Sequence, residues 1–405
     1  MKMDFSEARN LKRFPLLDAS RGLACVGVVA MHSHLDYLMP WYWGVMDFFF
    51  VMSGLLITRS LMTNCDKGRG TWSFLLYRAL RLLPAYLTIM LLYVIAAGVT
   101  GERDPSAVLP YLFLYQHTDM IFGARDEFSG IYEMLPYWSL ILEEHYYVLW
   151  GVFFCGVAYA RLKITPATVG AVALMLALAL ILRKAGVHYW TLPGRFDGFL
   201  VGSVAGIIIF MPHKVRVSGK LASWLFRAGA LVTIAAAARL LWRAVRSYQH
   251  DPSYAAGIWL DVSCYTMVSL VLVLGLLKMD IRRMRFGRAQ DGLAFIGLIS
   301  YEIYLVHFPL ATFLKKGFDF NFHNGGVLLF LVTMVLSSAL AWLMHRTLTA
   351  PALKRRERIY SFFVGLAGQW ADGRAAAPIL IPVDESGPVS APDDDPDPRR
   401  TSHNP

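Results

Sequence analysis

Residues 16–32 read LLDASRGLACVGVVAMH, an apolar stretch that contains Asp18, Arg21 and His32. Such a run approaches the roughly 20 residues that a helix needs to cross a bilayer. Eleven residues separate Arg21 from His32, about three turns of an α-helix, so both side chains lie on one face roughly 16 Å apart. Ionisable groups at membrane depth are costly and usually mark a ligand or proton pathway. The pair therefore predicts a functional site on a membrane helix.

The composition of the whole chain also indicates a membrane protein. Of its 405 residues, 56% are hydrophobic and 17% are charged, whereas a soluble domain carries about 25% charged residues. We therefore expect an all-α polytopic membrane protein with about ten transmembrane helices. The expected helices span residues 15–34, 43–62, 74–99, 138–160, 165–184, 194–211, 221–244, 256–278, 292–314 and 325–349.

Two segments fall outside these helices. The stretch from Ala107 to Tyr115 is apolar but too short to cross the membrane, so we expect it at the interface. Beyond residue 371 the chain is rich in Pro and Asp and lacks apolar periodicity, which is typical of disorder. The sequence predicts a multi-pass membrane domain over 1–371 and a disordered cytoplasmic tail over 372–405.

Positive charges set the expected orientation. The formal net charge is +10, and the charges fall in short loops, whereas a nucleic-acid-binding protein would gather them on one soluble face. We therefore expect no nucleic-acid partner. One set of loops is denser in positive charge, so the positive-inside rule places both termini in the cytoplasm and the chain in the cell membrane. The other side carries fewer positive residues, namely Arg183, Lys184, Arg243, Arg246, Lys315 and Lys316.

The four cysteines form no C-x-x-C pair, and three of them lie in or beside apolar spans. Neither a native disulfide nor a zinc site is therefore expected. His32 and His34 are two residues apart, which points their side chains to different sides of a helix and makes a poor metal pair.

His32 and Arg21 admit two interpretations. A lone histidine on an apolar helix face is usually hydrogen-bonded to a neighbouring helix. Arg21 on the same face, with Asp18 three residues before it, favours a functional site, because Asp18 can hold the arginine in an i, i+3 pair. Histidine is the side chain best suited to take and give a proton near neutral pH. We therefore expect His32 to act as a general base.

The third expected helix carries Arg78 and Arg81, which are three residues apart and so share a face. One interpretation is an anchor at the cytoplasmic interface, where the positive-inside rule concentrates such residues. The other is a pair of guanidinium groups that binds phosphates. Both interpretations place the two arginines on the cytoplasmic side.

Acidic residues occur in the second and fourth expected helices. Asp47 lies among aromatic residues and needs a partner, while Ser53-Gly54 in the same helix is typical of a close helix approach. Glu143 and Glu144 are adjacent, so they cannot share a face. One of them could orient a basic partner while the other faces water. The aromatic residues around these two acids are typical, at least in part, of an interfacial belt.

The ordered set of motifs resembles the acyltransferase-3 family of integral membrane acyltransferases over about residues 14 to 350. The matching motifs are Leu17-Asp18-x-x-Arg21-Gly22 followed by His32, Arg78-x-x-Arg81, Trp138-Ser139-Leu140 with Glu143, Glu144 and Tyr147, and Ile299-Ser300-Tyr301 with Tyr304 and His307. The chain departs from the family at His145, where glutamine is usual, and at Glu302, where serine is common. His307 is as readily structural as functional.

The resemblance implies a membrane O-acyltransferase that moves an acyl group from cytoplasmic acyl-CoA to a hydroxyl of a carbohydrate, such as a cell-surface polysaccharide. Acetyl-CoA is the simplest donor and would be a substrate, with no permanently bound cofactor. The implied roles are a general base (His32), groups that orient the base or the acceptor (Glu143 or Glu144), donor-binding groups (Arg21, Arg78, Arg81) and supporting acids (Asp18, Asp47). Some relatives carry an additional esterase-like domain, but we expect a stand-alone form.

The alternative is a proton-coupled secondary transporter of a small solute or acyl group, with Arg21, His32 and the acids as the substrate and proton path. Such a transporter would have Gly- or Pro-broken helices in matching halves, and the sequence shows no such pattern. The identity of the acceptor, the acyl chain length, a covalent intermediate and the oligomeric state stay open at this stage.

Overall fold

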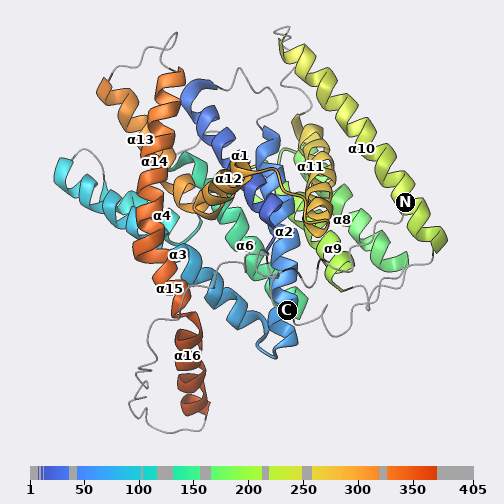
Figure 1. Ribbon diagram of the computed structural model, residues 1–405, viewed down its shortest axis with the longest axis horizontal. Helices are drawn as coiled ribbons and strands as arrows, with labels where there is room; N and C mark the ends of the chain where they lie inside the picture. Colours follow the sequence, from blue (N-terminus) through green and yellow to red (C-terminus); the bar gives the residue numbers. More distant parts are fainter. Residues whose placement is uncertain are drawn as a thin grey trace, which may run out of the picture. The chain divides into compact units, whose positions relative to one another are not determined.

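The computed structural model describes residues 8, 11, 13–35, 43–101, 104–115, 131–155, 166–211, 219–248, 258–318 and 326–371. All regular structure in these ranges is helical (Figure 1), which confirms the expected all-α polytopic class. The chain forms two compact units, residues 1–356 and 357–405. The expected tail over 372–405 lies outside the described residues.

The first unit begins with the helices that carry most of the sequence motifs. They are α1 (Pro15–Ala30) with a π-helical turn η2 (Met31–Leu35), α2 (Trp43–Asp66), α3 (Gly70–Thr100), the short η4 (Pro105–Val108) and α4 (Leu109–Leu112), η5 (Tyr132–Tyr137) and α6 (Trp138–Phe153). The later helices of this unit are α8 (Pro166–Lys184), α9 (Leu192–Phe210), α10 (Gly219–Tyr248), α11 (Ile258–Ile281), α12 (Arg288–Leu298), α13 (Ser300–Phe318), α14 (Gly326–Met344), η8 (His345–Thr349) and α15 (Ala350–Lys354). A further helix, α16 (Arg356–Ala371), belongs to the second unit apart from its first residue.

Each of the ten expected segments is helical where the structure describes it, but one of them is broken. The expected helix over 292–314 consists of α12 and α13, which meet at Ile299 with a bend of 72°. Within the described ranges, six helices are long and apolar enough to cross a membrane, or seven if this bent pair is one span. The chain is therefore a multi-pass membrane protein. The apolar stretch over 107–115 contains only short helical turns, as its length predicts.

Glycines allow two pairs of helices to pack with their backbones in direct contact. A Cβ atom on Gly22 of α1 would lie 1.9 Å from the carbonyl oxygen of Leu293 in α12. A Cβ atom on Gly54 of α2 would lie 2.1 Å from the carbonyl oxygen of Phe199 in α9. Small residues permit this close approach in membrane helices, so the expected role of Gly54 is confirmed.

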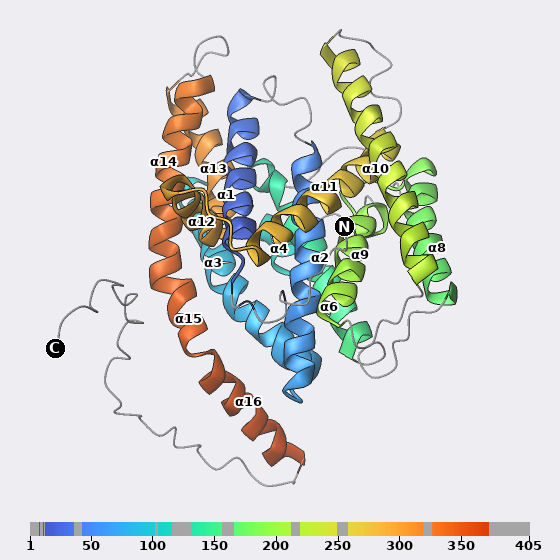
Figure 2. The ribbon, with the colours of Figure 1, turned by 45° about the vertical axis from the view of Figure 1, so that its right-hand side comes forward.

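The start of α1 is held by an acid from another helix, which the sequence analysis did not single out. Asp280, at the end of α11, accepts hydrogen bonds from the backbone N–H groups of Leu16 (2.8 Å) and Leu17 (3.2 Å). These N–H groups have no partner within α1, and a carboxylate at a helix N-terminus is stabilising. Asp280 therefore fixes the end of α1 that carries Arg21. Figure 2 shows α1 beside α13 and α14, whose residues also pack against it.

Several expected surface residues are buried instead. Trp138, Tyr146 and Tyr147 of α6 belong to the core rather than to an interfacial belt, with at most 7% of each exposed. Arg183 and Arg243, which the sequence places among loop charges, are also buried in ion pairs. Arg183 turns into the protein because the carboxylate of Asp197 pairs with it bidentately, and Arg243 pairs with the carboxylate of Asp261.

Candidate functional site

A cavity of about 300 Å³ lies between the helices that carry the motifs. Side chains from α1, α2, α3, α6 and α13 line it. From α1 they extend from Asp18 to Val28, and from α2 from Met46 to Leu56. The end residues of each stretch are ten positions apart, so the cavity follows the helices for roughly 15 Å. An elongated ligand suits such a shape better than a compact one.

One part of the cavity wall is strongly positive. Arg13, Arg21, Arg78 and Arg81 all contribute to it, so Arg78 and Arg81 share a face as their spacing predicts. The carboxylates in the wall are those of Asp18 and Glu143, so four guanidinium groups against two acids leave two positive charges in excess.

Local contacts hold two of these arginines in place. Arg21 Nη1 lies 3.6 Å from Asp18 Oδ1, which confirms the expected i, i+3 pair. The guanidinium carbon of Arg78 lies 4.9 Å from the centre of the Tyr147 ring, a cation–π geometry. The result is a group of oriented guanidinium donors facing an open volume, an arrangement suited to an anionic ligand.

Of the two adjacent acids in α6, Glu143 is the one that lines the cavity. Its carboxylate accepts a hydrogen bond from the hydroxyl of Ser53 in α2. Glu144 is not among the lining residues, as expected for neighbours on a helix. Ser53 itself lines the cavity. The sequence predicted only a role in helix packing for Ser53-Gly54 and no role in the site.

His32 is not among the residues that line this cavity. Arg21, Cys25 and Val28 of α1 line it, and His32 lies four residues beyond Val28, in the turn that follows α1. The helix changes to a π-helical turn at Met31, and His32 meets a histidine of α13 there. The Nδ1 atom of His32 lies 2.9 Å from Nε2 of His307.

Tyr304 connects the cavity with this histidine pair. Its side chain lines the cavity, and its ring centre lies 5.4 Å from that of His307. On the other side, Phe308 packs edge-on against His32 at 4.9 Å and also contacts Tyr132 at 5.4 Å between ring centres. The histidine pair therefore lies between the cavity and the segment that precedes α6.

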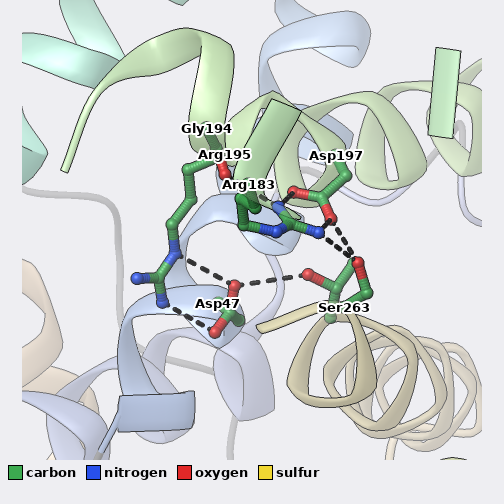
Figure 3. A network of polar contacts seen from close by, with 7 residues as sticks. Asp47, Arg183, Gly194, Arg195, Asp197 and Ser263 are labelled. Atoms are coloured by element: carbon green, nitrogen blue, oxygen red, sulfur yellow. Dashed lines mark hydrogen bonds and ion pairs between the residues drawn. The ribbon is translucent and has the colours of Figure 1, made fainter. Parts of the chain in front are cut away.

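Asp47 lies away from the cavity in a buried ion-pair network (Figure 3). Its carboxylate contacts Arg195 of α9, with Nη2 2.8 Å from Oδ2. In a second pair, Arg183 Nη2 lies 2.9 Å from Oδ2 of Asp197, and the Ser263 hydroxyl contacts both of these residues. Asp47 thus has the partner that its surroundings require. Its place in the structure indicates a supporting role for α2, because it does not line the cavity.

Several residues that line the cavity were not singled out as site residues by the sequence. Ser139, Tyr301 and Tyr304 occur in the quoted motifs, so position within a motif was the available signal. Arg13 lies just before α1 and also lines the cavity, although its sequence position marks it only as one of the positive charges in the loops. Ser53 carried no signal beyond its small size, because its partner Glu143 is 90 residues away.

A family model described as an acyltransferase domain matches residues 14–346. The chain belongs to the acyltransferase-3 family. The match covers every helix that contributes to the cavity and to the histidine pair. The arrangement of arginines, acids and histidines described above is therefore that of a membrane acyltransferase domain.

Two curated members of this family illustrate the likeness. The O-acetyltransferase OatA of Staphylococcus aureus (strain NCTC 8325 / PS 47) is 22% identical over 94% of this chain, which spans 65% of that protein's length. The peptidoglycan O-acetyltransferase OatA of Listeria monocytogenes serovar 1/2a is 29% identical over 35% of this chain and 24% of its own length. No solved structure matches the chain.

Proposed function

We propose that this acyltransferase moves an acyl group, most simply acetyl, from cytoplasmic acyl-CoA to a carbohydrate hydroxyl that arrives from the opposite side. One observation carries the proposal: an arginine-lined cavity reaches Val28 and Tyr304, each within four residues of one member of a histidine pair. The arginines provide an anion-binding surface for the donor, and the histidine pair provides a proton acceptor for the hydroxyl of the acceptor. Membership of the family supports the acyl-transfer chemistry.

The arginines are suited to the phosphates of the donor. Guanidinium groups bind phosphate oxygens in bidentate fashion, and two positive charges are in excess in the cavity wall. The volume of about 300 Å³ is at the lower end of the range for small-molecule sites. It therefore fits the narrow acyl-carrying arm, with the phosphates held by Arg78 and Arg81.

The reaction needs a group that removes the hydroxyl proton of the acceptor. His32 takes this proton, the hydroxyl oxygen forms a bond to the thioester carbonyl carbon, and the carbon–sulfur bond breaks. The departing thiolate takes up a proton, so the products are an oxygen ester and free CoA. A positioned general base contributes about 10²–10⁴-fold to such a step. Glu143, held by Ser53, orients the groups that enter the cavity.

The name of one relative supports peptidoglycan as the acceptor. That relative is a peptidoglycan O-acetyltransferase, so a hydroxyl of peptidoglycan is the acceptor to test first. Surface polysaccharide and lipid-linked sugar offer the same hydroxyl chemistry. The proposal for this chain is therefore O-acylation of a carbohydrate, with peptidoglycan fragments as the first probe.

Oriented vesicles test the proposal directly. Labelled acetyl-CoA is supplied on the cytoplasmic face and soluble peptidoglycan fragments on the other, and both fragment labelling and thiol release are measured. We expect one free CoA per labelled fragment, abolished in His32→Ala. The control is His145→Gln, which changes an exposed histidine of α6 outside the cavity. Transport of an intact solute without thiol release would favour the transporter instead.

A further inference from the structure

His307 is fully buried, and no role in the proposed reaction has been assigned to it. We infer that His307 is a positioning residue that fixes the tautomer and the ring orientation of His32, so that Nε2 of His32 accepts the proton. This inference rests on the proposed acyl transfer. It is carried by the geometry of the contacts that join α1 to α13.

The surroundings of His307 determine which of its nitrogens carries a hydrogen. Its Nδ1 atom lies 2.8 Å from the carbonyl oxygen of Tyr304 and 3.2 Å from that of Ile303. Carbonyl oxygens only accept hydrogen bonds, so Nδ1 must be the donor. A neutral imidazole has one N–H group, and Nε2 of His307 is therefore an acceptor.

The assignment of His307 determines that of His32. Nδ1 of His32 lies 2.9 Å from Nε2 of His307, so Nδ1 of His32 carries the hydrogen and donates it. Nε2 of His32 is then the nitrogen with a free lone pair. The hydrogen-bond network therefore assigns the tautomers of both histidines. A second group that orients a catalytic histidine in this way is a general device of proton-transfer sites.

Tyr304, whose carbonyl oxygen accepts the hydrogen bond from His307, is itself held by contacts of its side chain. The hydroxyl of Tyr304 lies 2.7 Å from that of Ser139 in α6 and also contacts the carbonyl oxygen of Pro136. The carbonyl that receives the His307 hydrogen therefore belongs to a residue anchored on two sides. Phe308 packs edge-on against His32 and restricts rotation of its ring. Tyr304 therefore contributes both to the wall of the arginine-lined cavity and to the support of the histidine pair.

A charged group close to His32 comes from the same helix as His307. Lys315 Nζ lies 3.4 Å from the carbonyl oxygen of His32. This positive charge is fixed in every His307 variant, so it does not distinguish them. Differences between variants therefore report the contact between the two histidines.

Three substitutions separate positioning from packing. In His307→Gln the side-chain oxygen can reach the place of Nε2 and accept from His32, whereas asparagine is too short and leucine has no polar atom. We expect His307→Asn and His307→Leu to lower kcat about 10- to 10²-fold, with the KM for acetyl-CoA unchanged because the arginine cavity is intact. His307→Gln should recover most of kcat, and His145→Gln serves as the unrelated histidine control.

Two results would overturn the inference. One is a His307→Leu enzyme with wild-type kcat per folded molecule. The other is a His307→Gln enzyme that loses as much as His307→Leu. If wild-type protein releases no CoA, the proposed acyl transfer fails instead, so the two failures are distinct.

A measurement on the unmodified protein covers the case in which the variants do not fold. ¹⁵N NMR of histidine-labelled protein, with the His32 signal assigned from His32→Asn, reports the tautomer directly. We expect the hydrogen on Nδ1 of His32. A hydrogen on Nε2 of the neutral ring would contradict the inference whatever the activity.

Discussion

Ser53 of α2 donates a hydrogen bond to Glu143 of α6, and both side chains line the arginine-rich cavity. Glu144, the next residue in the chain, does not line it. The two acids are chemically identical, so their positions on α6 alone determine which of them lines the cavity. A helix turns about 100° per residue, which separates their directions.

Glu143→Gln is predicted to lower acyl transfer at least tenfold, because it removes the negative charge and replaces one carboxylate oxygen with an NH2 donor beside Ser53. Glu144→Gln should retain activity within about threefold, since its side chain lies outside the cavity wall and it is not a positioned acid–base group, which would contribute about 10²–10⁴-fold. Initial rates of CoA release, normalised to folded protein, measure the difference. Equal losses in the two variants would contradict the assignment.

Arg78→Lys and Arg81→Lys are predicted to weaken acetyl-CoA binding although the charge is unchanged. A lysine is a point charge and cannot reproduce the two parallel hydrogen bonds of a guanidinium. Loss of a charge-assisted hydrogen bond costs about 1.5–3 kcal/mol, which is roughly ten- to 10²-fold in affinity. Calorimetric titration of the purified protein measures the Kd.

A matched control for these variants is Arg285→Lys, because Arg285 is highly exposed and lies outside the cavity. Its donor affinity should equal that of the wild type. If Arg78→Ala and Arg81→Ala also bind the donor with wild-type affinity, the two arginines are only topological anchors.

The sequence could predict those features that depend on spacing along one helix. The shared face of Arg78 and Arg81 and the pair formed by Asp18 and Arg21 follow from i, i+3 geometry, and the structure contains both. The helices themselves follow from apolar length. The break between α12 and α13 at Ile299 did not follow, because the isolated Gly297 beside it is also tolerated inside a continuous helix.

Contacts between distant helices could not be predicted in the same way. His32 and His307 are separated by 275 residues, and Asp47 and Arg195 by 148 residues. These contacts depend on which helices pack together. The packing of the helices depends on the combined interactions of all their surfaces and not on spacing within one helix. The need of Asp47 for a partner was predictable, whereas the identity of Arg195 was not.

Asp47→Asn is predicted to destabilise the protein by about 3–5 kcal/mol, because it removes the carboxylate that compensates a buried guanidinium. Arg195 is 1% exposed and Asp47 is 0% exposed. The double variant Asp47→Leu/Arg195→Met should recover much of this loss, since apolar pairs can replace buried ion pairs. Thermal unfolding in detergent measures the effect. Additive losses in the double variant would show that the two residues are not coupled.

Cys65 and Cys155 are predicted to form a disulfide on mild oxidation, because their sulfur atoms lie 2.7 Å apart. This pair and the pair of Ser53 and Glu143 are both separated by 90 residues, so α2 and α6 run parallel in one register. Oxidised protein, denatured and labelled with a maleimide, should show two reactive thiols instead of four. Cys65→Ser should prevent the loss of reactive thiols on oxidation, whereas Cys264→Ser should not. Four reactive thiols after oxidation would contradict this register.

Gly22→Ala and Gly292→Ala are predicted to change stability in opposite directions, although they lie on the two packed helices α1 and α12. A Cβ atom at Gly22 would lie 1.9 Å from the Leu293 carbonyl oxygen, while nothing lies within 4 Å of one at Gly292. Overpacking of this kind costs about 1–3 kcal/mol. An alanine in an open helical position instead gains about 0.5–1 kcal/mol.

The two glycine variants also differ in their expected effect on activity. Displacement of α1 from α12 moves Arg21, the residue next to Gly22, and with it the pairing to Asp18 in the cavity wall. Gly22→Ala should therefore weaken acetyl-CoA binding as well as lower the midpoint of thermal unfolding, whereas Gly292→Ala should leave the Kd unchanged. Wild-type stability and affinity in Gly22→Ala would mean that α1 and α12 do not touch at Gly22, and the placement of Arg21 would have to be revised.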